Sequence, residues 1–578
     1  MNDRALEGLD DRQREAASLL RGPVCVLAGA GTGKTRVITH RIAHGVDTGA
    51  YSPGRVMAVT FTTKAAGEMR GRLRALGVEG VAARTFHATA LAQLNFFWPQ
   101  LAGDVAPLII DNKVRVLGQA ADGLGLRLDA PTLRDVAGRI EARKVRMISI
   151  DRDAAEHPTG LPGVDVQALA DLQRAYEKVK DERRQLDFED VLLACAGMVE
   201  AEPRVAAAIH EQYRHLTVDE YQDVSPVQAR LLDLWLGDRQ DFCVVGDASQ
   251  TIYSFAGADP RFLLEFGDRY GDAQIVRLER NYRSDAAVLA VANELMRGRP
   301  GALVLSAAVR PDAPPRSGAE PTVTAFPDDT AEADGVAAAI AAQMSAGTDA
   351  HDIAVLYRAN AQSAPLLAAL AARGIPASVL GGKRFFDLPE VRQAVMALRG
   401  ASVAPLETTF VAAVRDVLRS LGLTDDPPPA GGALRDAWEA RAAVLRLAEE
   451  APAGTSLRAF TDELLARAKS QHEPTLRTVT LATLHAAKGL EWEHVHLVGM
   501  SEGLLPISYA TTFEQVDEER RLAYVGITRA GRTLSLSWSQ ASGSRPRQMS
   551  RFLQEIGTST LRAAGGRASS GGRPRSGR

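Results

Sequence analysis

A glycine-rich segment that ends in a lysine and a threonine lies near the N-terminus. The segment Ala28-Gly-Ala-Gly-Thr-Gly-Lys34-Thr35 follows a short apolar run at residues 24–27 and precedes a helical pattern at residues 36–44. Small residues let backbone N–H groups and a helix N-terminus converge on an anion. Lys34 would then reach the β- and γ-phosphates of a nucleotide and Thr35 would hold Mg²⁺. The alternative is a glycine-rich turn that only connects a strand to a helix.

A second candidate group stands at the end of another apolar run. Residues 216–218 are followed directly by Asp219 and Glu220. Two adjacent carboxylates at the end of a strand suit ATP hydrolysis, because one can bind the metal shell while the next orients or deprotonates the attacking water. We assign Asp219 to the metal and Glu220 to the water. A solvated acidic loop is the alternative.

Short apolar runs rich in β-branched residues, each closed by small or acidic residues, must position these groups. Continuous runs of this kind indicate strands that are buried on both faces. Longer helical patterns lie between them, at residues 64–76 and 390–398 among others, and this alternation predicts an α/β fold with parallel sheets. The expected strands are residues 24–27, 56–60, 216–219, 242–247, 275–278, 353–357, 479–483, 495–498 and 534–537.

Length and composition limit the remaining choices. The chain has 578 residues with 46% hydrophobic and 24% charged residues and a formal net charge of −3, so any nucleic-acid surface must be local. The three cysteines, Cys25, Cys195 and Cys243, are far apart, which predicts neither a disulfide framework nor a structural zinc site. The N-terminus lacks an apolar leader, so we expect a cytoplasmic protein with no membrane partner.

Ten motifs occur in a fixed order along the chain, and together they resemble the UvrD/Rep/PcrA group of superfamily 1 DNA helicases. Residues 489–492, 503–506 and 535–538 further resemble the second UvrD-type paralogue of actinobacteria, although we expect no four-cysteine element or HRDC domain here. The motifs are Gln13, residues 28–35, 60–66, 85–87, 219–223, 245–253, 278–284, 355–358, 483–491 and 518–529.

The resemblance implies two RecA-like P-loop NTPase domains, each with a mainly helical insertion. Core 1A would comprise residues 1–90 and 185–283, with insertion 1B at 91–184. Core 2A would comprise residues 284–400 and 475–560, with a reduced insertion 2B at 401–474. The Gly/Ser/Arg segment at 561–578 is expected to be a disordered tail, and residues 307–321 a surface loop.

The resemblance also assigns roles at the nucleotide. Gln13 would read adenine and Tyr282 would stack on it, while Glu491 would contact the ribose. Gln250, Arg283 and Arg529 would approach the γ-phosphate, where guanidinium groups can spread the charge of the transition state. The expected catalytic set is Lys34, Asp219, Glu220, Gln250, Arg283 and Arg529, and the expected nucleotide-binding set is Gln13, Ala28, Gly29, Ala30, Gly31, Thr32, Gly33, Lys34, Thr35, Arg36, Tyr282, Arg283, Glu491 and Arg529.

Aromatic and hydroxyl side chains in the motifs are the candidates for DNA contacts. A base that stacks on an aromatic ring gains about 1–3 kcal/mol whatever its identity, which suits a motor that must not stall on sequence. Core packing is the alternative for each ring alone. The expected DNA-contact residues are Thr60, Phe61, Thr62, His87, Tyr253, Phe255, Tyr357 and His485.

The leading hypothesis is an ATP- and Mg²⁺-dependent motor that moves 3′ to 5′ on single-stranded DNA and unwinds duplex DNA at junctions. The polarity follows from the resemblance alone, as do DNA repair proteins as partners and an association with the nucleoid. Three alternatives stay open: a translocase that displaces proteins and unwinds weakly, a helicase-nuclease of the RecB or AddA kind, and a noncatalytic DNA-binding scaffold. The hydrolytic side chains argue against the scaffold.

Overall fold

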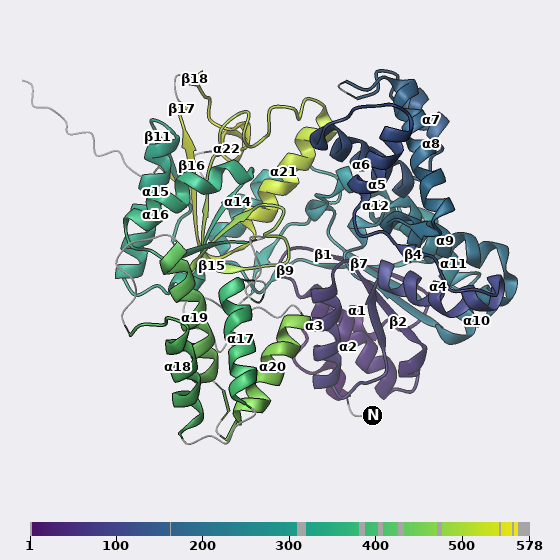
Figure 1. Ribbon diagram of the computed structural model, residues 1–578, viewed down its shortest axis with the longest axis horizontal. Coiled ribbons are helices and arrows are strands. Elements are labelled where there is room, and N and C mark those ends of the chain that lie inside the picture. The colour runs from purple at the N-terminus through teal and green to yellow at the C-terminus, as the bar shows by residue number, and fades with distance from the viewer. Residues whose placement is uncertain are drawn as a thin grey trace, which may run out of the picture. The chain divides into compact units, whose positions relative to one another are not determined.

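The computed structural model divides into two compact units, Met1–Arg283 with Met296–Pro311, and Ser284–Leu295 with Asp312–Arg578 (Figure 1). We call them unit 1 and unit 2. The structure describes residues 3–161, 163–308, 319–380, 386, 388–402, 408–425, 433–449, 451–452, 454–470, 477–542, 545–557 and 560–563.

Unit 1 is built on a six-stranded parallel sheet with the strand order β3-β2-β6-β7-β1-β8. Strands β2, β6 and β7 are buried at every residue, as continuous apolar runs predict. The strands are β1 (Pro23–Ala28), β2 (Val56–Thr60), β3 (Ala82–Thr85), β6 (His215–Val218), β7 (Phe242–Gly246) and β8 (Gln274–Leu278).

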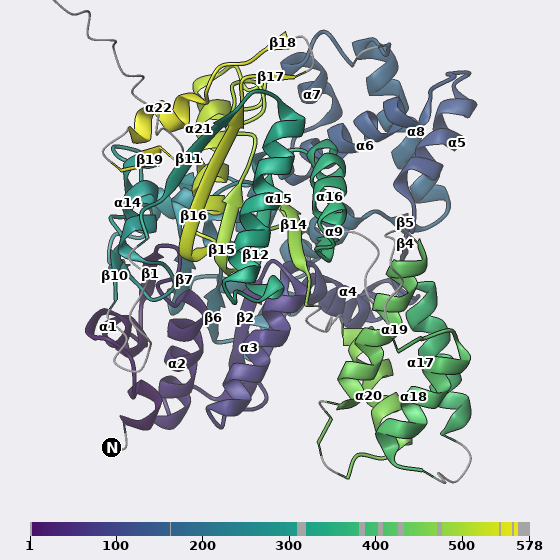
Figure 2. The same ribbon diagram turned by 90° about the vertical axis from the view of Figure 1, so that its left-hand side faces the viewer.

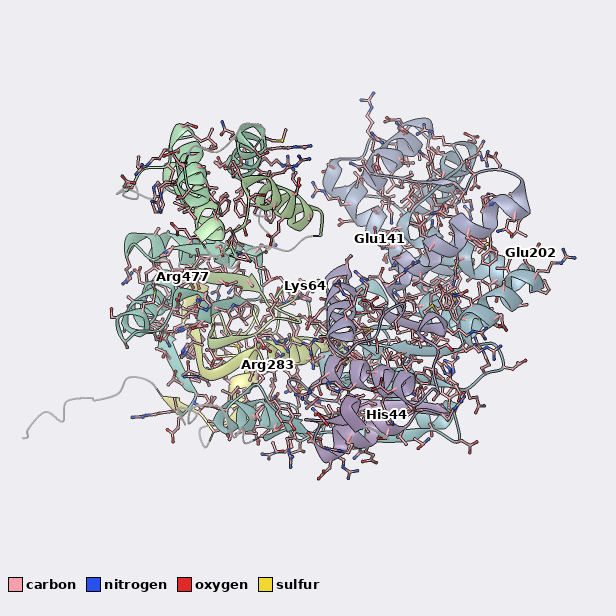
Figure 3. All side chains as sticks on the ribbon, turned by 90° about the horizontal axis from the view of Figure 1, so that it is seen from below. His44, Lys64, Glu141, Glu202, Arg283 and Arg477 are labelled. Atoms are coloured by element: carbon pink, nitrogen blue, oxygen red, sulfur yellow. The ribbon has the colours of Figure 1, made fainter. Side chains whose placement is uncertain are left out.

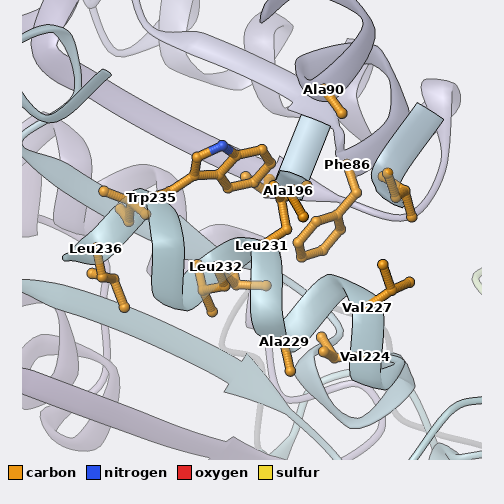
Figure 4. Packing of buried hydrophobic residues seen from close by; sticks show 14 of the residues in the cluster. Phe86, Ala90, Ala196, Val224, Val227, Ala229, Leu231, Leu232, Trp235 and Leu236 are labelled. Atoms are coloured by element: carbon orange, nitrogen blue, oxygen red, sulfur yellow. The ribbon is translucent and has the colours of Figure 1, made fainter. Parts of the chain in front are cut away.

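Helices cover both faces of this sheet, because successive side chains of each strand point to opposite faces. Val24 and Val26 of β1 pack into one hydrophobic cluster, whereas Cys25 between them packs into the other. Figure 4 shows the second cluster, in which Phe86 stacks on Trp235 with ring centroids 5.9 Å apart. The first face carries α1 (Asp11–Ser18), α2 (Lys34–Asp47) and α3 (Thr63–Ala75), and the second carries α4 (Phe86–Ala102), α9 (Phe188–Ala201), α10 (Pro203–Gln212) and α11 (Pro226–Leu236).

A helical segment is inserted in unit 1 between α4 and α9. It has its own hydrophobic cluster, which includes Leu117, Ile140 and Leu172, and its ends are joined where β4 (Leu108–Ile109) pairs with β5 (Gln185–Leu186). The expected start of the insertion at residue 91 lies inside α4, which packs on α9 of the sheet-bearing part. The helices of the insertion are α5 (Lys113–Gly123), α6 (Ala130–Val145), α7 (Ile150–Glu156) and α8 (Val166–Glu182).

Unit 2 contains a seven-stranded parallel sheet with the order β13-β14-β12-β15-β16-β11-β19. In Figure 2, helices α15 (Asp329–Ser345) and α16 (Ser363–Ala372) cover one face, and α14 (Ala286–Leu295) and α21 (Phe513–Ile527) cover the other. The strands are β11 (Thr322–Phe326), β12 (Ile353–Tyr357), β13 (Ala377–Val379), β14 (Val479–Thr483), β15 (Trp492–Leu497), β16 (Ala530–Ser539) and β19 (Arg562–Ala563).

A bundle of four helices is inserted in unit 2. Leu398, Val414, Val444 and Phe460 share one buried cluster, so α17 belongs to the bundle although we expected the insertion to begin at residue 401. The physical reason is that an amphipathic pattern predicts a helix but does not say which neighbours its apolar face meets. The bundle consists of α17 (Pro389–Ala401), α18 (Phe410–Ser420), α19 (Ala433–Glu449) and α20 (Leu457–Ser470).

The C-terminal segment also differs from the expectation. Arg562 and Ala563 form strand β19, paired with Thr322 and Val323 of β11, so the expected tail does not start at residue 561. Residues 564–578, and residues 309–318 of the expected loop, lie outside the described residues. Minor elements are α12 (Arg261–Leu264), α13 (Phe266–Arg269), α22 (Arg551–Ile556), β9 (Arg280–Asn281), β10 (Ser306–Ala307), β17 (Ala541–Ser542) and β18 (Arg545–Pro546).

The two parallel sheets, each flanked by helices and each carrying a helical insertion, confirm the α/β prediction. Within the described ranges, no helix combines the length and the apolar character needed to cross a bilayer.

Candidate nucleotide and DNA sites

The glycine-rich loop connects β1 to α2, as the sequence predicts. Gly31 and Gly33 have φ angles of 67° and 87°, a left-handed conformation that favours glycine. A Cβ at Gly31 would lie 2.6 Å from Nδ2 of Asn281, and one at Gly33 would lie 2.9 Å from Nε2 of Gln13. The loop therefore requires glycine at both positions for backbone geometry and for space.

A hydrogen-bond network fixes the loop from both sides. Gln13 is buried and donates from Nε2 to the Thr32 carbonyl at 2.9 Å, while its Oε1 accepts from the Asp10 backbone N–H at 3.3 Å. Asn281 donates from Nδ2 to the Ala30 carbonyl at 2.6 Å. Tyr282 donates its backbone N–H to Gly31 at 2.8 Å and its hydroxyl to Asp10. Gln13 and Tyr282 thus meet at Asp10 beside the loop.

The acidic pair follows β6 as predicted. Asp219 is buried, and burial together with the charge of Glu220 raises its pKa. Glu220 adopts a φ of 52°, which is uncommon for a residue with a side chain. Its Oε1 lies 3.8 Å from Nζ of Lys34, so the loop lysine and the expected water-activating carboxylate are neighbours.

Gln222 and Asp247 connect the acidic pair to Gln250. Gln222 donates from Nε2 to Oε2 of Glu220 at 2.5 Å and accepts the Asp247 backbone N–H at 2.9 Å. Asp247 in turn accepts from Nε2 of Gln250 at 2.6 Å, and burial raises the pKa of Asp247. The chain of contacts joins the expected catalytic carboxylate to the expected phosphate-sensing glutamine.

The residues brought together in unit 1 fit a nucleotide phosphate and Mg²⁺. The loop leaves no space for side chains at Gly31 and Gly33, and its backbone runs into the N-terminus of α2, where anions are stabilised. Asp219 is a buried carboxylate with a raised pKa, which a divalent cation would offset. Thr35 is half-buried on the first turn of the same helix.

Arg283 also lies beside this loop, because its backbone N–H donates to Oδ1 of Asn281 at 2.8 Å and a Cβ on Gly31 would come 2.9 Å from the Arg283 Cβ. Figure 3 labels Arg283 together with Lys64 on α3 and His44 on α2. The exposed Arg36 donates to the Gly8 carbonyl at 2.8 Å, away from the loop backbone.

Arg529 and Glu491 belong to unit 2. Arg529 is buried and donates from Nη1 to the Leu490 carbonyl at 3.0 Å and from Nε to the Val525 carbonyl at 2.9 Å. The Trp492 backbone N–H donates to the Arg529 carbonyl at 3.0 Å. Glu491 is exposed and stands in the chain between Leu490 and Trp492, which both contact Arg529.

Several expected DNA-contact residues of unit 1 are accessible. Phe255 is 68% exposed and packs edge-on to Tyr253, with ring centroids 6.1 Å apart. Thr62 is exposed and caps α3 by accepting the Ala65 N–H at 3.1 Å. Phe61 is half-buried and packs edge-on to Phe86, with ring centroids 5.7 Å apart. In unit 2, His485 is half-buried, and burial with the charge of Arg358 lowers its pKa to about 4.

Two expected DNA-contact residues are enclosed instead. Thr60 is 1% exposed at the end of β2, and Tyr357 is 0% exposed at the end of β12, where it packs into a hydrophobic cluster of unit 2. Both strands are buried at every residue, and the burial continues through their last positions. The DNA contacts expected of Thr60 and Tyr357 stay predictions, and both side chains are buried in this structure.

The structure adds Phe188, which the sequence analysis missed. His87 at the start of α4 stacks on Phe188 at the start of α9, with ring centroids 3.7 Å apart. Phe188 is 54% exposed, whereas burial lowers the pKa of His87 to about 4 and keeps it neutral. The sequence shows an aromatic residue directly after Asp187, a typical helix N-cap. It does not show the contact with His87, which lies about a hundred residues earlier.

Two parallel sheets, one with a complete phosphate loop and acidic strand end, define a P-loop NTPase with two RecA-like units. The UvrD/REP helicase N-terminal domain matches residues 9–271, and the UvrD-like helicase C-terminal domain matches residues 276–403 and 443–541. The chain belongs to the UvrD/Rep helicase family.

Named relatives agree with this assignment. The chain is 45% identical to ATP-dependent DNA helicase UvrD2 of Mycobacterium tuberculosis (strain ATCC 25618 / H37Rv), over 97% of this chain and 83% of the relative. It is 28% identical to ATP-dependent DNA helicase PcrA of Bacillus subtilis (strain 168), over 93% and 83%, and 29% identical to ATP-dependent DNA helicase Rep of Escherichia coli (strain K12), over 95% and 94%.

Proposed function

We propose that the chain is an ATP-dependent DNA helicase that moves 3′ to 5′ on single-stranded DNA and unwinds duplex DNA. The observation that carries the proposal is the hydrolytic group of unit 1, in which Lys34 lies 3.8 Å from Glu220 and Glu220 is joined through Gln222 to Asp247 and Gln250. A DNA-binding scaffold would have no use for this group. The names of the relatives support the same activity.

Each side chain of this group has a distinct task. Lys34 and the loop N–H groups would bind the terminal phosphates, and Thr35 and Asp219 would hold Mg²⁺. The bound Mg²⁺ would neutralise phosphate charge during hydrolysis. Glu220 accepts the proton of the attacking water, while Gln250 and Arg283 contact the γ-phosphate. Gln13 and Tyr282, which both contact Asp10, bind the adenine.

Gln222 orients the Glu220 carboxylate, since its Nε2 donates to Oε2 of Glu220 at 2.5 Å. A carboxylate offers about four acceptor sites, so Glu220 can keep this contact while it accepts a hydrogen bond from the attacking water. The same glutamine binds the backbone that precedes Gln250, so a shift of Gln250 on the γ-phosphate can move Glu220.

We assign the sheet-bearing part of unit 1 to core 1A and that of unit 2 to core 2A, with the insertions α5–α8 and α17–α20 as 1B and 2B. Family membership supports a role for Arg529 and Glu491 of core 2A at the nucleotide. For DNA we propose Phe61, Thr62, His87, Phe188, Tyr253, Phe255 and His485. Chromosomal DNA at the nucleoid, single-strand junctions and DNA repair proteins complete the set of proposed partners.

The proposal is tested by steady-state ATP hydrolysis with and without single-stranded DNA. We expect strong stimulation by DNA, and Glu220→Gln should abolish hydrolysis while ATP and DNA still bind. Normal hydrolysis by this variant would refute the assignment of Glu220. Absence of stimulation would favour the scaffold.

A translocase that unwinds weakly is the second candidate, because insertion 2B is a small bundle with a single cluster of buried residues. Unwinding of 3′-tailed, 5′-tailed and blunt duplexes separates the two candidates. A helicase of the proposed polarity opens the 3′-tailed duplex, whereas a translocase hydrolyses ATP on it without separating the strands.

A further inference from the structure

A cavity of about 910 Å³ lies in unit 1 at the amino ends of four neighbouring strands. Arg55 directly precedes β2, His215 begins β6, Asp241 directly precedes β7 and Arg21 lies shortly before β1. All strands of the sheet are parallel, so these positions share the edge opposite to the phosphate loop and to Asp219. We call this cavity the amino-edge pocket.

The pocket carries an excess of positive charge. It is lined by Arg21, Arg55, Arg214 and Arg239 but by only two carboxylates, Glu211 and Asp241, which leaves a net charge of plus two when its histidines are neutral. Glu211 forms ion pairs with two of the arginines, Arg55 at 3.0 Å and Arg214 at 2.8 Å. Asp241 pairs with Arg21 at 3.0 Å.

Arg239 is bound by backbone groups. Its guanidinium donates to the carbonyls of Trp235 and Tyr213, both at 2.5 Å. Burial and the charge of Arg214 lower the pKa of Arg239, which indicates that the pocket does not fully compensate its cations. An anion in the pocket would supply this compensation.

His215 forms an aromatic part of the pocket wall. The residue is 9% exposed, lines the pocket and stacks on Tyr51 with ring centroids 4.0 Å apart. Within the described part of the chain, its Nδ1 has no hydrogen-bond partner. Burial and the charge of Arg21 lower its pKa to about 4, so the ring is neutral near pH 7 and can donate one N–H. This nitrogen is shielded from the pocket as well as from solvent, so His215 contributes the face of its ring rather than a hydrogen bond.

We propose that the amino-edge pocket binds a phosphate-bearing anion through the guanidinium groups of Arg55 and Arg214, with the charge of Arg239 beside them. Guanidinium groups match phosphate oxygens in paired, charge-assisted hydrogen bonds. The volume of about 910 Å³ falls in the range of small-molecule sites and exceeds the need of one phosphate. Diphosphate and the phosphate tail of a nucleotide share the recognised chemistry.

Calorimetric titration of the full chain with diphosphate tests the proposal. The titration uses the Lys34→Ala background, which weakens phosphate binding at the glycine-rich loop. Arg55→Ala/Arg214→Ala should weaken diphosphate binding about tenfold or more, since each substitution removes a charge-assisted contact. Both side chains are about half exposed, so thermal unfolding should show that the variant folds.

Arg152→Ala is the matched control, because Arg152 is an exposed arginine of unit 1 that pairs with Glu156 at 2.9 Å outside the pocket. It should leave diphosphate binding unchanged. Arg55→Lys/Arg214→Lys keeps the charge but loses the paired geometry, and we expect intermediate binding. The imidazole signals of His215 should shift on titration and their pKa should rise.

Parallel titrations with ADP and inorganic phosphate separate the sources of the phosphate group. Only the binding that Arg55→Ala/Arg214→Ala weakens belongs to the pocket, because Gln13 and Tyr282 can still bind ADP at the nucleotide site. If that binding is tighter for diphosphate, it assigns the pocket to a free inorganic anion; if it is tighter for ADP, it assigns the pocket to a nucleotide, and either supports the proposal. Failure to bind millimolar diphosphate, or diphosphate binding that the double alanine variant leaves intact, would overturn it. Weakened binding of duplex DNA without any loss of diphosphate binding would also overturn it.

Discussion

A buried ion-pair network should stabilise the junction between the helical insertion of unit 1 and its sheet-bearing part. Lys144 of α6 and Lys180 of α8 are almost fully buried and both contact Asp187, the N-cap of α9, at 2.7 and 3.3 Å. Glu177 and Asp190 complete the network, with Lys180 to Glu177 at 2.7 Å and Lys144 to Asp190 at 2.6 Å. The network therefore joins two helices of the insertion to a helix of the sheet-bearing part.

We expect Lys180→Met to destabilise this junction by about 3 kcal/mol or more. The methionine fits the aliphatic stem of the lysine, but the three carboxylates then keep only Lys144 and, at Glu177, Arg143 at 3.2 Å. Removing one partner of a buried ion pair typically costs about 3–5 kcal/mol, because the other charge stays buried without compensation. Lys178→Met on the same helix is the matched control, since Lys178 is 77% exposed and lies 3.9 Å from Glu182; a surface pair contributes at most about 1 kcal/mol.

Amide hydrogen exchange is the assay, because one unfolding free energy is not defined for a chain with several cooperative parts. Exchange in α6 and α8 should accelerate in Lys180→Met by roughly a hundredfold or more, as about 3 kcal/mol implies, while α17–α20 of unit 2 stay unchanged. Adding Asp190→Asn should restore part of the protection, because it removes one uncompensated charge. Equal exchange in Lys180→Met and Lys178→Met would refute the reasoning.

Four further results are expected. Gln222→Leu should lower kcat of the DNA-stimulated ATPase about tenfold or more with little change in KM for ATP, since it removes the 2.5 Å contact to Glu220; an unchanged kcat would show that Gln222 is only structural. Phe188→Ala should weaken single-stranded DNA binding by about 1–3 kcal/mol in a fluorescence titration, whereas Phe96→Ala, another exposed phenylalanine of unit 1, should not. Gly33→Ala should raise KM for ATP, because its φ of 87° and the 2.9 Å approach to Gln13 disfavour a Cβ; an unaltered KM would contradict this. Finally, Lys144 and Lys180 lower the pKa of Asp187 despite its burial, so its contribution to stability is present above the unfolded pKa of about 3.9 and is lost as the pH falls through the lower folded pKa; the protection of α8 amides, relative to the intrinsic exchange rate at each pH, should therefore fall in acid, and less so in Asp187→Asn.

The sequence predicts the buried strands better than the exposed ones. Strands β2 and β12 have apolar runs that are buried at every residue, and both lie where expected. Strand β13 has three residues that are all half-buried, and β11 is half-buried or exposed throughout, so neither has an apolar run to detect. The burial of Thr60 and Tyr357 could not be predicted, because a motif places a residue at a strand end without saying whether that end reaches the surface.

The nucleotide site was predictable where a motif of neighbouring residues determines the local backbone geometry. The glycine loop is local, and two of its glycines have the left-handed backbone that the motif requires. Asn281 was missed as a partner of this loop because its contact to Ala30 joins residues 251 positions apart. Asp10 was missed for the same reason, since the Tyr282 hydroxyl that donates to its carboxylate lies 272 positions away in sequence.

The two edges of the sheet of unit 1 bury different charged groups, and both proposed ligands follow from this difference. At the carboxyl edge, burial raises the pKa values of the carboxylates Asp219 and Asp247. At the amino edge, burial lowers the pKa of Arg239 beside an excess of arginines. A divalent cation would compensate the carboxylates, and an anion would compensate the arginines. Diphosphate in the amino-edge pocket would contact residues directly before β2 and β6, and β6 ends next to Asp219 and Glu220, so its effect on ATP hydrolysis can be measured with the nucleotide site intact.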